Sequence, residues 1–178
     1  MDISRVTLFA GHYGSGKTNI AVNYAKYLAA LSYPVTIADL DIVNPYFRTK
    51  DSEAELASCG IRLICPTYAN TNLDLPALPA QMYDIIRERD RYAVLDIGGD
   101  DRGAYALGRY APEILEENRY EMLFVVNFYR PLTETAADAL EVMREIECAC
   151  GMRFTALVNN SNLGEETTAE TVLETQSK

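Results

Sequence analysis

The feature that most constrains this chain is a glycine-rich stretch near its beginning, FAGHYGSGKTNIAVNYAKYL, which runs from Phe9 to Leu28. Within it, GHYGSGKT fits the pattern G-x-x-x-x-G-K-[ST] in full. An apolar run precedes the glycines and a pattern of helical period follows them. A strand-to-helix turn of this kind aims successive backbone N–H groups into one concavity, which suits a phosphate. The stretch therefore predicts a phosphate-binding loop; the competing interpretation is a glycine-rich turn without a ligand.

The residue types within the loop suggest how a nucleotide would be held. Gly14 and Gly16 let the backbone approach an anion closely, because no Cβ stands in the way. Lys17 would place its ammonium beside the β- and γ-phosphates, and Thr18 would offer its hydroxyl to Mg²⁺. We expect nucleotide contacts along the loop and the helix start, from Gly11, His12, Tyr13, Gly14, Ser15, Gly16, Lys17, Thr18 and Asn19.

Short apolar segments alternate with helical patterns along the rest of the chain. Continuous apolar runs rich in β-branched residues predict parallel strands covered on both faces, at 6–10, 35–39, 61–65, 92–97, 122–127 and 154–159. Helical periodicity falls between them, at 17–32, 51–59, 76–90, 103–118, 132–149 and from about residue 165. This alternation predicts an α/β fold, a three-layer sandwich around a mostly parallel sheet with P-loop NTPase topology.

Length and charge limit the organisation and the partners of the chain. Its 178 residues suit a single domain, 1–178, although the polar, acidic ending suggests that a C-terminal strand or helix is missing. The net charge of −10 argues against a nucleic-acid surface and offers no basic stripe for a membrane. Because neither a signal peptide nor a bilayer-spanning run is visible, we expect a cytoplasmic protein.

Acidic residues follow two of the predicted strands. Asp96 lies at the end of the run YAVLDI, where a carboxylate would hold Mg²⁺ or its water shell. Gly99 follows three residues later, and Asp100 comes directly after Gly99. Asp39 and Asp41 lie at the end of the second predicted strand, 35–39. The carboxyl ends of parallel strands meet at one edge of a sheet, so we expect these acids beside the phosphate loop, with Mg²⁺ between them. Ordinary turn residues, or a chance cluster, are the alternatives.

With GHYGSGKT, ADLD and DIGGD in this order, the whole chain resembles the SIMIBI class of P-loop NTPases, in particular the MinD/ParA/nitrogenase iron protein/CobQ–CobB superfamily. The resemblance implies binding of ATP with Mg²⁺, and a possible homodimer with nucleotide near the interface. Asp39 and Asp96, with Thr18, would serve the metal. Lys17, Asp41 and Asp100 would be the catalytic residues, with Asp41 orienting the attacking water. Gly99 would sense the γ-phosphate.

The same resemblance implies a base-reading segment in ALVNNSN. Asn160 is the expected reader of the adenine edge, with Asn159 behind it. The N-K-x-D pattern that reads guanine is not seen, which favours ATP over GTP. The alternative is that both asparagines merely shape a loop.

Two departures from the family pattern affect the expected activity. The superfamily's signature lysine, which reaches the phosphates of the neighbouring subunit, is replaced in this chain by His12, and Tyr13 replaces a glycine. No cysteine matches the ligands of the iron protein's cluster, so we expect no iron–sulfur cluster and four free thiols, Cys59, Cys65, Cys148 and Cys150.

Three functions therefore remain open. The leading hypothesis is a slow Mg²⁺-dependent ATPase that acts as a nucleotide-dependent switch. The second is phosphoryl transfer or ligation to a small acceptor, similar to CobB and dethiobiotin synthetase, with the loops 44–50 and 68–81 binding the acceptor. The third is an ATP-gated binding module that does not hydrolyse.

Overall fold

A computed structural model describes residues 3–40, 52–65, 81–99 and 101–178. Its six strands form one sheet in the order β3-β2-β4-β1-β5-β6, and every neighbouring pair is parallel. The strands are β1 (Val6–Ala10), β2 (Val35–Leu40), β3 (Arg62–Ile64), β4 (Tyr92–Ile97), β5 (Tyr120–Val126) and β6 (Ala156–Asn159). The predicted α/β fold with a parallel sheet is confirmed.

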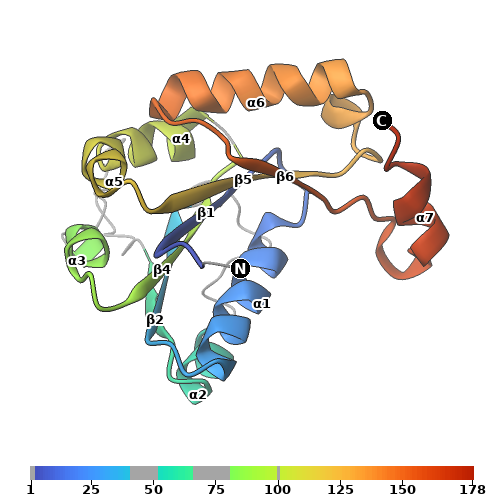
Figure 1. Cartoon of the computed structure of the whole chain (residues 1–178). Coiled ribbons are helices and arrows are strands. Elements are labelled where there is room, and N and C mark those ends of the chain that lie inside the picture. Colours follow the sequence, from blue (N-terminus) through green and yellow to red (C-terminus); the bar gives the residue numbers. More distant parts are fainter. Residues whose placement is uncertain (1–2, 41–51, 66–80, 100) are drawn as a thin grey trace, which may run out of the picture.

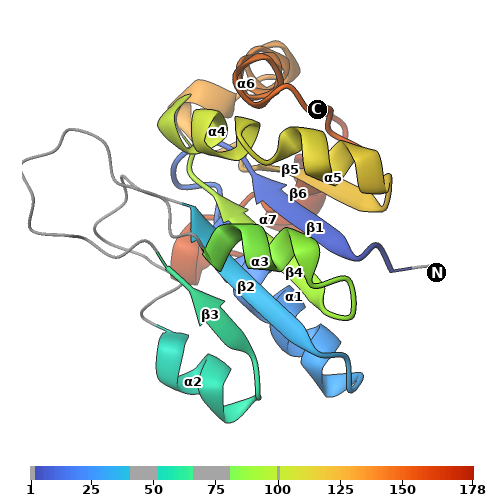
Figure 2. The same cartoon turned by 90° about the vertical axis from the view of Figure 1, so that its left-hand side faces the viewer.

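Helices cover both faces of this sheet, which gives the three expected layers (Figures 1 and 2). One face carries α1 (Lys17–Ala30) and α2 (Glu53–Ser58). The other carries α3 (Gln81–Arg87), α4 (Asp101–Gly108), α5 (Ala111–Glu117) and α6 (Ala136–Cys150). Because side chains alternate along β1, Leu8 joins the core under α3 to α6 and Phe9 joins the core under α1. Both faces of the central strands are therefore buried.

The predicted helix over 103–118 is wrong, because this segment forms two helices. The helix α4 ends at Gly108 and α5 begins at Ala111, with the break at Arg109–Tyr110. Pro112 explains the break: it has no N–H to donate and its ring would clash with the preceding turn, so it fits only the first turn of a new helix.

The C-terminal third also differs from the expected pattern. The predicted helix over 132–149 is a short 3₁₀ turn, η2 (Pro131–Thr133), followed by α6, which starts where Thr135 and Asp138 form a capping box. The last segment forms η3 (Gly164–Glu166) and α7 (Ala169–Glu174). The expectation that every strand is covered on both faces fails at the edge strand β6, where Leu157 is 53% exposed.

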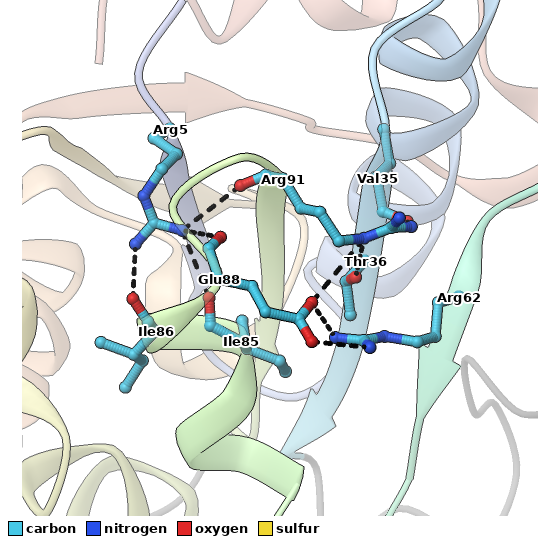
Figure 3. Close-up of polar contacts among 8 residues, drawn as sticks. All are labelled: Arg5, Val35, Thr36, Arg62, Ile85, Ile86, Glu88 and Arg91. Carbon is cyan, nitrogen blue, oxygen red and sulfur yellow. Dashed lines mark hydrogen bonds and ion pairs between the residues drawn. The ribbon is translucent and has the colours of Figure 1, made fainter.

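A buried arginine fastens the edge of the sheet at which the parallel strands begin. The Arg5 guanidinium donates hydrogen bonds to four backbone carbonyls at the end of α3 and in the turn that follows, those of Ile85, Ile86, Glu88 and Arg91 (Figure 3). It also forms an ion pair with the carboxylate of Glu117 on α5. The loops that could bind a ligand lie at the opposite edge, where the strands end.

Candidate nucleotide site

The phosphate-binding loop lies between β1 and α1, at the centre of the sheet's carboxyl edge. The Ser15 N–H donates to the His12 carbonyl at 3.1 Å, which closes the turn. Gly16 then adopts the left-handed conformation, with φ +83°, and α1 begins at Lys17. No side chain caps this helix start and no acidic residue lies in its first turn. Its first N–H groups and the positive end of its dipole are therefore available to an anion.

Two glycines bring other loops into contact with this one. A Cβ on Gly16 would lie 2.4 Å from the Asn160 amide nitrogen, and a Cβ on Gly99 would lie 2.7 Å from the Gly11 carbonyl oxygen. Both distances are too short for non-bonded atoms. The loops after β4 and β6 can therefore pack directly against the phosphate loop only because glycine stands at these positions.

The side chains of the loop are buried around its concavity. Ser15, Lys17 and Thr18 are each less than 8% exposed. The Ser15 hydroxyl has no hydrogen-bond partner among the residues that the structure describes. A buried hydroxyl without a partner costs free energy, so the loop would gain from an acceptor such as a phosphate oxygen. The buried donors of this loop therefore suit the phosphates of a nucleotide.

Two of the predicted carboxylates lie together beside the loop. Asp39 on β2 and Asp96 on β4 are directly opposite each other in neighbouring strands, and both are buried. Asp96 is also opposite Phe9, two residues before the loop begins. Carboxylate and hydroxyl oxygens are ligands that suit Mg²⁺, which binds through one or two protein carboxylates plus phosphate oxygens. The donor set of Thr18, Asp39 and Asp96 thus fits this ion.

Within the described ranges, no group of three or more histidine, cysteine, aspartate or glutamate side chains could hold a metal alone. Asp41 and Asp100 lie outside the described residues, as do the loop 44–50 and nearly all of 68–81. No disulfide joins the four cysteines, each of which lies in the described part of the chain.

The two asparagines expected to read a base occupy different positions. The Asn160 amide donates to the Ser15 carbonyl at 2.8 Å, so this residue braces the phosphate loop. The Asn159 amide donates to the Thr175 hydroxyl at 2.9 Å, while its oxygen accepts from Ser161. Asn160 also lines a cavity beside the loop, whereas Asn159 ties β6 to the segment that follows α7.

This open cavity of about 1240 Å³ extends from the phosphate loop along the side of α1. Its floor is formed by the loop and by Lys17 and Thr18. The exposed Asn23 and the half-buried Tyr24 of α1 form one wall, and the segments after β5 and β6 form another. Partial burial raises the pKa of the Tyr24 phenol above its ordinary value, so it remains an uncharged O–H at neutral pH. A nucleoside attached to bound phosphates would have room in this cavity.

The segment after β5 was not predicted as part of the site. Asn127 is fully buried, and its side chain joins both loops of this wall: the amide donates to the Asn162 carbonyl, and the oxygen accepts from the Asn162 and Tyr129 N–H groups. Arg130 follows three residues later and donates from Nε to the Gly14 carbonyl at 3.2 Å. The sequence NFYRPLT after a strand end was the available signal, because asparagine and proline there indicate an ordered turn.

His12 and Tyr13, which differ from the loop pattern of the resembling superfamily, both line the cavity. Nδ1 of His12 lies 3.0 Å from the Tyr13 carbonyl oxygen, a contact that is a hydrogen bond when Nδ1 carries the hydrogen. Tyr13 is 55% exposed. At the position where the resembling family has its signature lysine, this chain thus has the His12 imidazole, which contacts the backbone of the phosphate loop to which it belongs.

No protein-family model and no curated protein matches this chain. Several solved structures do match it in fold. The signal recognition particle receptor FtsY from Elizabethkingia anophelis aligns with a TM-score of 0.54 at 19% identity, over 88% of this chain and 50% of that one. The kinase domain of the Escherichia coli tyrosine kinase ETK aligns with a TM-score of 0.56 at 17% identity, over 92% and 70% respectively.

FtsY from Mycoplasma mycoides gives a TM-score of 0.55 at 20% identity, over 88% of this chain and 52% of that one. The chain thus spans about half the length of the FtsY receptors that it matches. None of the described helices is long and apolar enough to cross a bilayer. At these identities the likeness concerns the fold alone. The chain therefore shares with these structures the α/β fold around a parallel sheet that its sequence predicted.

Proposed function

We propose that this protein binds a nucleoside triphosphate with Mg²⁺, ATP by preference, and hydrolyses it slowly, so that the bound nucleotide controls its shape or its partner. The observation that carries the proposal is the loop between β1 and α1. It combines an uncapped helix start, the buried Lys17 and a buried Ser15 hydroxyl that has no partner among the described residues. These are the donors that a phosphate chain requires.

Each residue would have a separate task. Lys17 and the loop N–H groups would bind the phosphates, and Gly99, which packs on the loop, would couple the γ-phosphate to the segment after β4. Thr18, Asp39 and Asp96 would hold Mg²⁺, which when bound would neutralise charge on the phosphates. Asp41 would orient the attacking water, and Asp100 would act beside it.

The choice of base and the number of subunits belong to the same proposal. Asn160 lines the cavity and would read the adenine edge, with Asn159 behind it. One structural neighbour, FtsY from Elizabethkingia anophelis, is known in complex with GDP, so GTP has to be tested beside ATP. A homodimer with nucleotide near the interface is part of the proposal, as suggested by the resemblance.

The substitution Lys17→Ala tests nucleotide binding. We expect it to weaken the binding of ATP by about tenfold or more, because it removes a charge-assisted contact to the phosphates. The matched control is Lys26→Ala, since Lys26 lies on the same helix but pairs with Glu55 outside the cavity. Calorimetric titration with ATP, GTP and ADP, with and without Mg²⁺, gives the affinities. Equal ATP affinity for wild type and Lys17→Ala would refute the proposal, provided that both melt at similar temperatures.

A second candidate function is a nucleotide-gated binding module without significant turnover. It is favoured by His12, which stands where the family places the lysine that acts on the neighbouring subunit. Phosphate release from saturating ATP distinguishes the two functions. Slow, Lys17-dependent release supports the ATPase, whereas tight binding with release at background supports the module. Release that rises only when one small metabolite is added would instead support phosphoryl transfer.

A further inference from the structure

Arg130 lies against the phosphate loop, although it is 116 residues away from it in sequence. Its Nε donates to the Gly14 carbonyl at 3.2 Å, and a Cβ built on Gly14 would lie 3.6 Å from its Cζ. It lines the same cavity as Lys17 and Thr18. We propose that Arg130 is a second phosphate-binding cation, supplied by the same chain as the loop. This inference rests on the proposed function.

The sheet explains why Arg130 reaches the loop. The strands β1 and β5 are neighbours, with Ala10 opposite Phe124, so the segments that follow these two strands emerge side by side. The turn after β5 is held by Asn127, whose carbonyl accepts from the Arg130 N–H at 3.1 Å and from the Thr133 hydroxyl at 2.6 Å. Pro131 keeps the residue before it extended, and Arg130 has φ −110° and ψ 138°. The backbone of Arg130 is thus positioned independently of any ligand.

The chemistry of the side chain suits a phosphate chain. A guanidinium has five N–H donors and stays charged, and the contact with Gly14 uses only the one on Nε. In the described ranges of the chain, no carboxylate forms an ion pair with Arg130. Among the described residues, its positive charge therefore has no neutralising partner beside the phosphate loop, in a chain whose net charge is −10. A bound polyphosphate would supply that partner.

The source of this cation distinguishes the site from the family pattern. The signature lysine of the resembling proteins reaches the phosphates of the neighbouring subunit, and His12 stands in its place in this chain. Arg130 approaches the loop of its own chain instead. A single subunit would therefore hold two phosphate-binding cations, Lys17 and Arg130, and binding would not require a second copy.

The test is competition by inorganic pyrophosphate and by ATP against a fluorescent ATP analogue. We expect Arg130→Ala to weaken both competitors by about tenfold, because the lost contact is a charge-assisted one to phosphate. The exposed Arg144 on α6 lies outside the cavity, so Arg144→Ala is the matched control and should change neither. A loss for ATP but not for pyrophosphate would place Arg130 on the nucleoside and overturn the proposal.

Arg130→Gln separates binding from a purely structural role. Its amide can still donate to the Gly14 carbonyl, but it carries no charge. If Arg130 only shapes the turn, this variant binds pyrophosphate as the wild type does, and the proposal is wrong. If Arg130 binds phosphate, Arg130→Gln loses affinity nearly as far as Arg130→Ala, while its melting temperature stays at the wild-type value.

Mixing two variants tests whether the arginine acts within one chain. Equimolar Lys17→Ala and Arg130→Ala should bind ATP no better than the sum of the separate proteins, because neither chain has both cations. Recovered affinity in the mixture would show that Arg130 acts on a neighbouring subunit. Different results would refute the two proposals. If Lys17→Ala leaves nucleotide affinity unchanged, the proposed function is wrong. If Lys17→Ala lowers the affinity but Arg130→Ala does not, only the inference about Arg130 is wrong.

Discussion

At the scale of single residues, the site depends on glycines that allow close backbone contacts. Gly16 is the clearest example, since it combines a left-handed conformation with an approach that a Cβ would block. As a consequence, Asn160 packs directly against the point where the phosphate loop meets the start of α1. A substitution there changes the loop and its brace together.

We expect Gly16→Ala to destabilise the protein more than a conformational cost alone would. The matched control is Gly151→Ala, because Gly151 has nearly the same backbone, φ +71° and ψ 17° against +83° and 16°, but nothing within 4 Å of an added Cβ. The control should lose about 1–2 kcal/mol in the free energy of unfolding, the cost of a left-handed alanine. Gly16→Ala should lose clearly more, because the Cβ would displace the Asn160 amide from Ser15. Urea denaturation measures both, and equal losses would show that the contact with Asn160 is unimportant.

At the scale of elements, the edge of the sheet where the strands begin and the edge where they end have different roles. The edge where the strands begin is fastened by Arg5, which is 3% exposed and binds α3 and the turn after it (Figure 3). Its ion pair with Glu117 adds α5 to the same cluster. The edge where they end carries the phosphate loop, Asp39 and Asp96. Changes at the first edge should therefore affect stability without affecting the ligand site.

The ion pair of Arg5 and Glu117 predicts a pH dependence of stability. The hydrogen bonds from Arg5 hold the pKa of the Glu117 carboxyl below its ordinary value of 4.5. A carboxyl whose pKa is lowered by folding contributes its full stabilisation above the unfolded value and loses it as the pH falls through the folded value. The Glu117→Gln variant should thus be less stable than wild type at pH 7, by about 3–5 kcal/mol if Arg5 stays buried and unpaired.

The measurement is the urea midpoint of both proteins between pH 7 and pH 3. The gap between them should be constant above about pH 5 and should narrow below the ordinary value of the Glu117 carboxyl, 4.5. A gap that widens toward acid would contradict the lowered pKa of this carboxyl. ATP affinity at pH 7 serves as the control, because Glu117 lies at the edge away from the loop and should leave it unchanged.

At the scale of the whole molecule, the excess of acidic residues matters more than any one ion pair. The chain has 26 acidic and 16 basic side chains, and pairs such as Lys26–Glu55 and Arg62–Glu88 lie at the surface, where each contributes little. Mutual repulsion of the excess carboxylates should oppose the compact state. Screening this repulsion should stabilise the fold.

We therefore expect the melting temperature at pH 7 to rise when NaCl increases from about 10 mM to 150 mM, because the screening length falls from roughly 30 Å to 8 Å. A gain of about 1 kcal/mol corresponds to roughly 2–4 °C for a chain of this size. The effect should shrink as the pH approaches the isoelectric point, near 4.6, where the net charge vanishes. A melting temperature that falls with salt would mean that attractive pairs outweigh the repulsion.

The loop from Gly11 to Thr18 and its place between a strand and a helix were predictable from the sequence, because a P-loop is one contiguous strand, turn and helix whose geometry follows from local residues. The same holds for Asp39 and Asp96, since parallel strands place their ends on one edge. The break before α5 was missed although Pro112 indicated it, because the apolar period continued across the break.

The sequence by itself determined an α/β sheet and a phosphate loop, because both follow from patterns among residues that are close together in the chain. Only the tertiary structure decided that β5 lies beside β1, and with it that Arg130 meets Gly14 and that Asn127 holds both loops of the cavity wall. These contacts join residues far apart in the chain, and no local periodicity encodes which strands become neighbours. Their energies come from burial and hydrogen bonding across the assembled sheet, which exist only once the whole core has formed.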